Sequence, residues 1–470
     1  MRTKLTIIAS IWIWLCPAAY ITAQDWPQFR GGNASGVSAA RQLPTEFGPK
    51  SLEWRLEVPF ARSSPIVVVD RIYLTAHEGE KLITLAVDRK RGKILWQREI
   101  IRDHTHKVHK GNDTASATPV SDGRNVYAFF ADLGLVSYDR AGKERWRLKL
   151  GPFDNFYGMS SSPVLRGATL IQLCDQRKGS FIVAVDKDTG KIRWRKERPE
   201  ATLSYTTPIF WDDGEKTELI VSSTGRLDAY ALETGERLWW VGKQGGSPIA
   251  TPVLENGIVF ASSNGSDTPQ YPTFDEILKF TDKNHDGKLQ LEEVKGTPLE
   301  DHFGFLDVNN DGAISREEFE ALRQGSVGEY YGLVAVRAGG QGDQTADHLI
   351  WRYKKSFPWV PSPLLYDGVL YFVKDGGIIT SINPSNGEAW KVGRAPDAIG
   401  EYRASPVAAD GKIYFISVAG RITVVKAGRQ WEVVSVSDLG EECEATPAIA
   451  DGHIYLRTRN AVYSFAPKAR

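Results

Sequence analysis

The sequence is poor in cysteine, carries no excess charge of either sign and has no long apolar run. Its 470 residues include three cysteines, and 58 lysines and arginines balance 58 aspartates and glutamates. A neutral chain has no electrostatic reason to bind nucleic acid or an anionic membrane surface, so we expect neither as a partner. Cys174 and Cys443 fall in distant parts of the repeat described below, which favours two buried free thiols over a disulfide.

The first 23 residues resemble a secretory signal peptide. Arg2 and Lys4 form a charged start, residues 5–15 are apolar, and residues 21–23 end in the small residue typical of a cleavage site. The apolar run is short for a membrane span, and Cys16 follows a leucine, which disfavours a lipoprotein anchor. We therefore predict a periplasmic or secreted protein with no transmembrane domain in the mature chain. An uncleaved anchor is the alternative.

The dominant feature is a short motif that recurs eight times, in which two residues, mostly Ser, Thr or Ala, precede a proline. Six of the seven intervals between successive motifs lie between 41 and 54 residues, and the fifth is 111. Spacing of roughly 40–50 residues is typical of a propeller blade, and the long interval must contain an insertion. The prolines are Pro65, Pro119, Pro163, Pro208, Pro252, Pro363, Pro406 and Pro447.

Each repeat reads as four antiparallel strands. In the repeat 161–199, strands are expected at 169–174, 181–186 and 191–197, and a glycine-containing turn at 187–190 precedes the last of them. The last strand of each repeat contains a tryptophan for which we expect a structural role. These tryptophans are Trp96, Trp146, Trp194, Trp239, Trp351, Trp390 and Trp431, and an eighth, Trp54, precedes the first repeat.

The offset of Trp54 predicts how the ring closes. The final repeat, 445–467, has room for only three strands and no tryptophan, so the strand at 52–58 is expected to supply the fourth. Pairing the two ends of the chain removes two open sheet edges. We therefore predict an all-β, eight-bladed β-propeller closed by an N-terminal strand, with a small α-helical insertion in blade 5. A pair of β-sandwiches is the alternative.

The repeat carries a recognisable pattern, Ala184-Val185-Asp186, then Thr189-Gly190, then Trp194. This pattern resembles the pyrroloquinoline-quinone (PQQ)-like repeat. That family includes eight-bladed quinoprotein dehydrogenases and also non-enzymatic propellers such as the outer-membrane assembly factor BamB. The resemblance implies the fold, but it says little about function because one scaffold hosts unrelated activities.

The loops that enter each inner strand should converge on one face of the ring, together with the loops between second and third strands. A histidine-rich loop, 102–115, could hold a metal or substrate, or could be a solvated loop. No cysteine or carboxylate at ligand spacing supports a metal there. The candidate binding residues at this channel mouth are His109, Asn112, Tyr157, Tyr205, Trp359, Tyr402, Arg403 and Glu444.

The insertion contains two twelve-residue loops, 282–293 and 307–318, that match the EF-hand pattern at every ligand position. Calcium takes six to eight hard oxygens, here from side chains at positions 1, 3, 5, 9 and 12 and the carbonyl at 7, and glycine at 6 permits the turn. The predicted ligands of two calcium ions are Asp282, Asn284, Asp286, Lys288, Gln290 and Glu293, and Asp307, Asn309, Asp311, Ala313, Ser315 and Glu318.

Helix signals frame both loops. Thr273 and Glu276 form a capping box before a helix at 274–280, and further helices are expected at 302–306 and 316–324. Leu289 and Ile314, at position 8 of each loop, are expected to pair as short strands. Since the insertion falls between the second and third strands of blade 5, it should lie on the channel-mouth face, beside or over the channel.

The domain limits follow from these signals: a signal peptide at 1–23, an extension at 24–50, propeller at 51–265 with 51–58 closing blade 8, the EF-hand pair at 266–327 and propeller again at 328–468. We expect an exported calcium-binding scaffold that binds a protein or a small ligand, with no catalytic residue assigned. The alternative is a quinoprotein oxidoreductase with PQQ in the channel. Such enzymes add adjacent cysteines, which this chain lacks, and neither Asp113 nor Glu444 can be matched to their catalytic aspartate.

Overall fold

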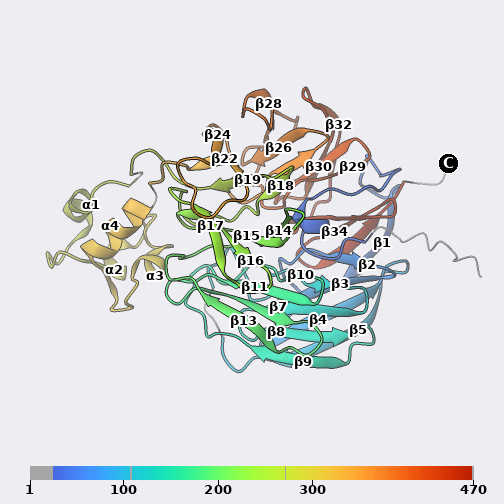
Figure 1. Cartoon of the computed structure of the whole chain (residues 1–470), viewed down its shortest axis with the longest axis horizontal. Helices are drawn as coiled ribbons and strands as arrows, with labels where there is room; N and C mark the ends of the chain where they lie inside the picture. The colour runs from blue at the N-terminus through green and yellow to red at the C-terminus, as the bar shows by residue number, and fades with distance from the viewer. Residues whose placement is uncertain (1–24, 106–107, 270, 326, 468–470) are drawn as a thin grey trace, which may run out of the picture.

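The computed structural model describes residues 25–105, 108–269, 271–325 and 327–467. Within these residues, eight antiparallel sheets form the blades of a propeller, and the α-helices gather in one module beside the ring (Figure 1). The predicted all-β, eight-bladed propeller with a helical insertion is confirmed. The predicted signal peptide lies outside the described residues.

The first four blades follow one another along the chain. Their strands are β2 (Ile66–Val68), β3 (Arg71–Glu78), β4 (Lys81–Asp88) and β5 (Lys93–Ile101); β6 (Val120–Ser121), β7 (Asn125–Phe130), β8 (Gly134–Asp139) and β9 (Glu144–Lys149); β10 (Val164–Arg166), β11 (Thr169–Cys174), β12 (Phe181–Asp186) and β13 (Ile192–Glu197); β14 (Ile209–Asp212), β15 (Thr217–Ser223), β16 (Arg226–Ala231) and β17 (Arg237–Val241).

Blades 5 to 8 complete the ring. Their strands are β18 (Val253–Glu255), β19 (Ile258–Ser263), β22 (Gly332–Arg337) and β24 (Leu349–Tyr353); β25 (Leu364–Tyr366), β26 (Val369–Lys374), β27 (Ile378–Ile382) and β28 (Ala389–Arg394); β29 (Val407–Ala409), β30 (Lys412–Ile416), β31 (Arg421–Lys426) and β32 (Glu432–Asp438); β33 (Ala448–Ala450), β34 (His453–Arg457), β35 (Ala461–Phe465) and β1 (Leu52–Glu57).

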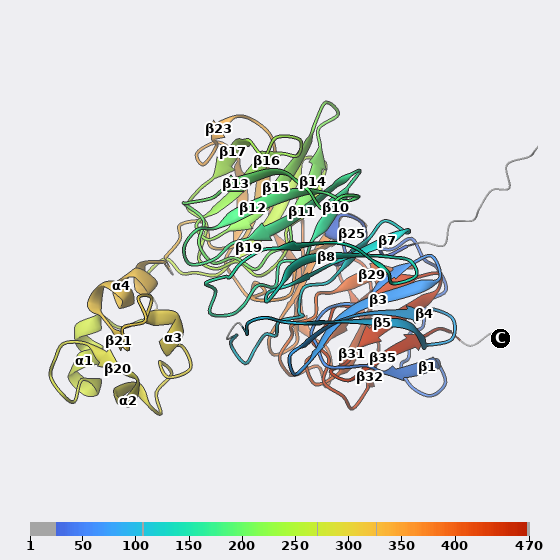
Figure 2. The ribbon, with the colours of Figure 1, turned by 90° about the horizontal axis from the view of Figure 1, so that it is seen from below.

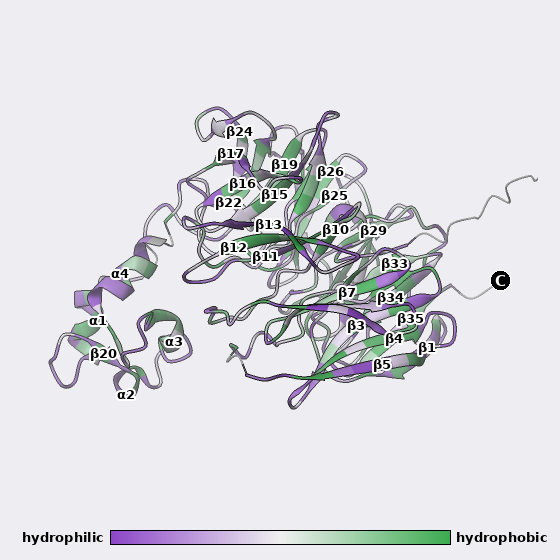
Figure 3. Cartoon of the chain, turned by 60° about the horizontal axis from the view of Figure 1, so that its bottom comes forward, coloured by the Kyte–Doolittle hydropathy of each residue, from purple (hydrophilic) through white to green (hydrophobic). Residues whose placement is uncertain are grey.

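The middle strands of each blade are buried on both faces because neighbouring blades stack against them. All residues of β11 are buried, whereas most of the outer strand β13 is exposed. Figure 3 shows the hydrophobic stretches lying along the blade strands. Burial of both faces explains why the central strands are nearly continuous apolar runs.

The ring closes as predicted. Strand β1 pairs antiparallel with β35, so that blade 8 has the order β1-β35-β34-β33. The first and the last described strands therefore share a sheet, so blade 8 has its four strands and the ring has no gap with unpaired strand edges.

A circle of buried hydroxyl groups joins the inner strands. The Ser or Thr before each repeat proline accepts a hydrogen bond from the backbone N–H of its counterpart in the preceding blade, over 3.0–3.2 Å. The last bond, from the Thr446 N–H to the Ser64 hydroxyl, closes the circle. The hydroxyl of each repeat thus satisfies a buried backbone N–H of the preceding blade, which explains why Ser or Thr stands directly before the proline. The eight residues are Ser64, Thr118, Ser162, Thr207, Thr251, Ser362, Ser405 and Thr446.

The blade tryptophans connect neighbouring blades. The Trp146 Nε1–H donates to the Lys187 carbonyl at 2.9 Å, and a Cβ on Gly190 would lie 2.7 Å from the indole, so only glycine fits that turn. The buried Nε1 of Trp431 has no hydrogen-bond partner among the described residues, and in blade 4 Trp239 donates to Glu218 of its own blade. There an extra strand, β23 (Gly342–Asp343), pairs with β17 and makes blade 4 five-stranded.

The N-terminal segment before β1 lies across the inner strands of several blades. It includes the short 3-10 helix η1 (Gly32–Ala34), and its contacts reach β2, β14 and β29 through Trp26, Asn33 and Val37. Trp26 is buried against the ring. These contacts fall within the inner strands, at Val67, Phe210 and Ala408. Arg30 of the same segment donates to the carbonyl of the repeat proline Pro363 at 2.7 Å, so the segment is bonded along the inner side of the ring.

None of the helices in the described ranges is long and apolar enough to span a membrane. Cys174 and Cys443 are buried free thiols, as expected from the sequence.

Candidate functional site

The insertion folds into a compact helical module. Its elements are α1 (Phe274–Thr281), β20 (Leu289–Gln290), α2 (Leu291–Val294), α3 (Phe303–Leu306), β21 (Ala313–Ile314) and α4 (Arg316–Gly325). The predicted capping box at Thr273 and Glu276 opens α1, and Leu289 pairs with Ile314 as predicted. Buried apolar side chains from all four helices meet behind the two strands.

The first loop folds around the side chains expected to bind calcium. Asp282 Oδ2 accepts from the Gly287 N–H at 3.0 Å, Asn284 Oδ1 from the Asp286 N–H at 2.9 Å, and Glu293 Oε1 from the Lys283 N–H at 2.8 Å. These bonds hold positions 1, 3 and 12 facing the inside of the loop.

The second loop repeats this geometry. Asp307 Oδ2 accepts from the Gly312 N–H at 3.0 Å, and Glu318 Oε1 accepts from the Val308 N–H at 2.8 Å. Burial alone would raise the pKa of Glu318, but hydrogen bonds from Ser315 and from loop amides lower it below its usual value. The carboxylate is therefore ionised at neutral pH, as a calcium ligand must be.

The donor sets of both loops fit calcium. Each presents carboxylate, amide or hydroxyl, and backbone carbonyl oxygens, which are hard ligands. Asp282 Oδ1 is buried and has no hydrogen-bond donor, so a cation would satisfy it. Across the described residues, no three His, Cys, Asp or Glu side chains form a ready-made metal cluster. The individual ligand assignments stay predictions.

The module is docked on loops of blades 2 and 3. His302 Nδ1 lies 3.0 Å from the Tyr157 hydroxyl, and Lys110 pairs with Asp301 at 2.8 Å. The Phe305 ring contacts Tyr157, at 5.7 Å between centroids. All these propeller residues lie in channel-mouth loops, so the module lies on the predicted face. It lies beside the ring rather than over its centre (Figures 1 and 2).

Two predicted mouth residues belong to an ion network. Glu444 Oε2 accepts from Arg62 Nε at 2.7 Å and from Arg403 at 3.2 Å, and Arg62 also pairs with Asp113 at 3.4 Å. The carboxylates of Glu444 and Asp113 are nearly buried. Arg62 was not among the mouth residues predicted from the sequence. Its position could have indicated it, because Arg62, Arg403 and Glu444 each directly precede a repeat motif.

Four further predicted residues form an aromatic group. The His109 ring lies 5.0 Å from Tyr157, Tyr157 lies 5.9 Å from Tyr205, and Asn112 donates to the Tyr157 carbonyl at 2.7 Å. Burial and the neighbouring His302 lower the pKa of His109, so it is neutral at neutral pH. Burial raises the pKa of Tyr157 to about 12.

The remaining two candidates are placed differently. Tyr402 is 2% exposed and donates to the Ala398 carbonyl at 2.8 Å, and its side chain is buried in the apolar cluster shared by blades 6 and 7. Trp359 is 64% exposed and presents a free indole surface. Of the two, Trp359 is the one that can reach a partner.

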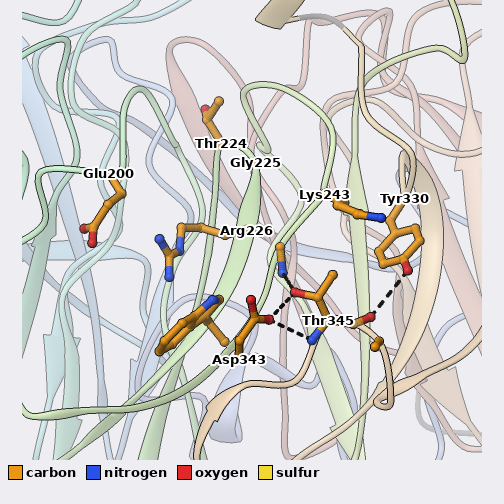
Figure 4. A pocket seen from close by; sticks show the side chains of 11 residues that line it. Glu200, Thr224, Gly225, Arg226, Lys243, Tyr330, Asp343 and Thr345 are labelled. Atoms are coloured by element: carbon orange, nitrogen blue, oxygen red, sulfur yellow. Dashed lines mark hydrogen bonds between the residues drawn. The ribbon is translucent and has the colours of Figure 1, made fainter.

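A cavity of about 660 Å³, which the sequence analysis did not predict, lies at the rim of blade 4 (Figure 4). Its walls include Arg226, Trp240 and Lys243 of blade 4, Tyr330 from the return of the insertion, and Asp343 of β23. The charged groups there are largely paired: Arg226 donates to Asp228, Lys243 to Glu329 and Arg237 to Glu200. The cavity therefore offers no evident excess charge to select a ligand.

Comparison with protein families identifies the fold family. The family described as outer membrane protein assembly factor BamB matches residues 132–268 and 332–467, more than half of the chain. The chain belongs to this family. The EF-hand family matches residues 299–322, which contain the second loop. A comparison with curated proteins found no match.

Solved structures share the fold at low sequence identity. BamB from Moraxella catarrhalis is 12% identical, with a TM-score of 0.55 over 89% of this chain and 98% of that one. Quinohemoprotein alcohol dehydrogenase from Comamonas testosteroni is 13% identical, with a TM-score of 0.57 over 95% and 81%. A europium-containing methanol dehydrogenase is 10% identical, with a TM-score of 0.57 over 94% and 98%. The PQQ-like propeller is thus common to BamB and to quinoprotein dehydrogenases, and these likenesses concern the fold alone.

Proposed function

We propose that the chain is an exported, calcium-binding scaffold that holds a partner protein at its channel mouth. The supporting observation is the convergence at that mouth of loops entering blades 1, 2, 3, 7 and 8, together with the EF-hand module. Loops placed by a rigid ring are the usual binding elements of such folds. The match to an outer-membrane assembly factor supports a periplasmic setting and a protein partner.

Calcium at two sites is part of this proposal. Residues 266–327 would form the calcium module, between propeller segments 51–265 and 328–468. Asp282, Asp286 and Glu293 would supply the carboxylates of the first site, and Asp307, Asp311 and Glu318 those of the second. When bound, calcium would supply a fixed positive charge that holds each loop closed.

The PQQ alternative has weaker support from the residues. The family resemblance implies adjacent cysteines beside the quinone, whereas Cys174 and Cys443 are single, buried and in different blades. At the mouth, the acids Asp113 and Glu444 are already paired with arginines. These residues do not fit a quinone site, and we derive no redox step.

In the first experiment, the purified mature chain is titrated with calcium and with PQQ. Calorimetry measures binding, and dye-linked alcohol oxidation measures turnover. We expect about two calcium ions per chain, without quinone uptake or dye reduction. Stoichiometric quinone binding with substrate-dependent dye reduction would overturn the scaffold function.

A second experiment locates the partner. A photo-crosslinking residue is placed at Trp359, at the mouth, or at Val392, which is also exposed but lies on the outer strand β28. In exporting cells we expect a defined protein adduct from position 359 and none from 392. Equal labelling from both positions, or from neither, would contradict the proposed binding face.

A further inference from the structure

Arg177, in the loop between β11 and β12, reaches from blade 3 into the EF-hand module. Its guanidinium donates to the Gly304 carbonyl at 3.0 Å and to the Asp307 carbonyl at 3.3 Å. The side chain is only 10% exposed, and the nearest acid is Asp154 at 3.7 Å. Most of its hydrogen bonding is therefore directed at the module.

The two carbonyls are at the end of α3, where the second calcium loop begins. An α-helix leaves its last carbonyls without backbone donors, and an arginine can satisfy them. The Val308 N–H would bond to Gly304 if the helix continued, but it donates instead to Glu318 at 2.8 Å. Arg177 thus takes the place of that amide and leaves it free to orient Glu318, the position-12 ligand.

The same contact holds Asp307, the first ligand of the loop. Its backbone carbonyl accepts from Arg177 while its carboxylate accepts from the Gly312 N–H inside the loop. The side chain of Asp307 is buried. A single arginine of the propeller therefore fixes the backbone between α3 and the ligands at both ends of the loop.

We propose that Arg177 is a positioning residue of the second calcium site, through which calcium binding and docking of the module on the channel mouth stabilise each other. This inference rests on calcium binding by the second loop, as proposed above. Coupling between two sites is reciprocal, so whatever docking contributes to calcium affinity, calcium contributes to docking.

The sign of the expected effect separates positioning from simple electrostatics. Removing a positive charge near a cation site should tighten calcium binding by Coulomb's law. Loss of a positioning contact should weaken it instead. Lys178 provides the matched control, because it is the neighbouring exposed cation in the same loop.

The experiment measures calcium binding by calorimetry in the full mature chain with Glu293→Gln, which silences the first loop. In this background we expect Arg177→Ala to weaken calcium binding about five- to tenfold, within the usual range of coupling between sites. Arg177→Lys should restore part of the affinity, and Lys178→Ala should leave it unchanged or tighter. In the converse background, Glu318→Gln, Arg177→Ala should not change calcium binding by the first loop.

Hydrogen exchange supplies the reciprocal readout. Calcium should protect backbone amides of residues 153–159 in the native chain and should fail to do so with Arg177→Ala. Unchanged or tighter calcium binding by Arg177→Ala, or calcium-independent exchange in the native chain, would overturn the coupling. Absence of calcium binding in the second loop of the native chain would instead overturn the proposed calcium function.

Discussion

The two EF-hand loops share one ligand pattern but have different surroundings. In both, positions 1, 3 and 12 accept hydrogen bonds from equivalent loop amides. The described contacts of the first loop stay inside the module, whereas α3 and the start of the second loop are bonded to the propeller. The ligand pattern determines which ion a loop can bind. The surroundings of the loop determine whether binding of that ion also affects the contact with the propeller.

The loops also contact each other. Strands β20 and β21 pair between them, and Lys288 of the first loop lies 3.3 Å from Asp311 of the second. Both charged groups are about half exposed, so this ion pair contributes little. The paired strands β20 and β21 therefore contribute more to holding the two loops together than the ion pair does. The two loops are nevertheless expected to differ in their effect on docking of the module.

The largest effect should follow calcium removal. At calcium a hundredfold above its dissociation constant, binding stabilises the native state by about 2.7 kcal/mol. A chelator should therefore abolish exchange protection in residues 274–325 and leave strands such as β26 and β30 protected. Hydrogen exchange measured with and without calcium checks this. Equal loss of protection throughout the ring would mean that calcium stabilises the whole chain.

The second prediction compares the position-12 ligands. Glu293→Gln and Glu318→Gln should each remove one calcium equivalent, because glutamine cannot bind calcium with two carboxylate oxygens. Only Glu318→Gln should also loosen the docking contact at Tyr157. Calorimetry counts the ions, and exchange in residues 153–159 reports docking. The comparison between the loops would fail if both variants loosened this segment equally.

The third prediction concerns the ring itself, away from calcium. Thr251→Val removes a hydroxyl that accepts from the buried Thr207 N–H at 3.1 Å. An unpaired buried amide costs about 1–3 kcal/mol, so unfolding of the calcium-loaded chain should be easier by that amount. The exposed Thr234→Val is the control. A change in calcium affinity with Thr251→Val would show that the stability of the ring and calcium binding by the module are not independent.

The sequence predicted the features that depend on local pattern. The spacing of the repeat motif predicted the blades and the way in which the ring closes. The pattern of residues from Asp282 to Glu293 predicted an EF-hand loop. Contacts between distant segments were not predictable in this way. Nothing near Arg177 indicates that it reaches α3, since the two are far apart in sequence and meet only through the fold. Tyr402 and Trp359 occupy similar loops, yet one is buried and the other exposed.

The smallest effect should come from pH at the docking contact. His109 is held neutral, first by burial and then by His302 and Lys110, while Asp301 opposes the shift and Arg403 adds to it. Its folded-state pKa lies below the unfolded value, so its contribution is complete above that value and is lost as pH falls through the folded pKa. The protection factors of residues 153–159, which are corrected for the intrinsic pH dependence of exchange, should therefore fall more between pH 7.5 and 5.5 in the native chain than with His109→Gln. An identical fall in both would assign the pH dependence to the other groups of this contact, and the docking of the second loop would then depend on Arg177, the Lys110–Asp301 pair and the contacts of Tyr157 rather than on His109.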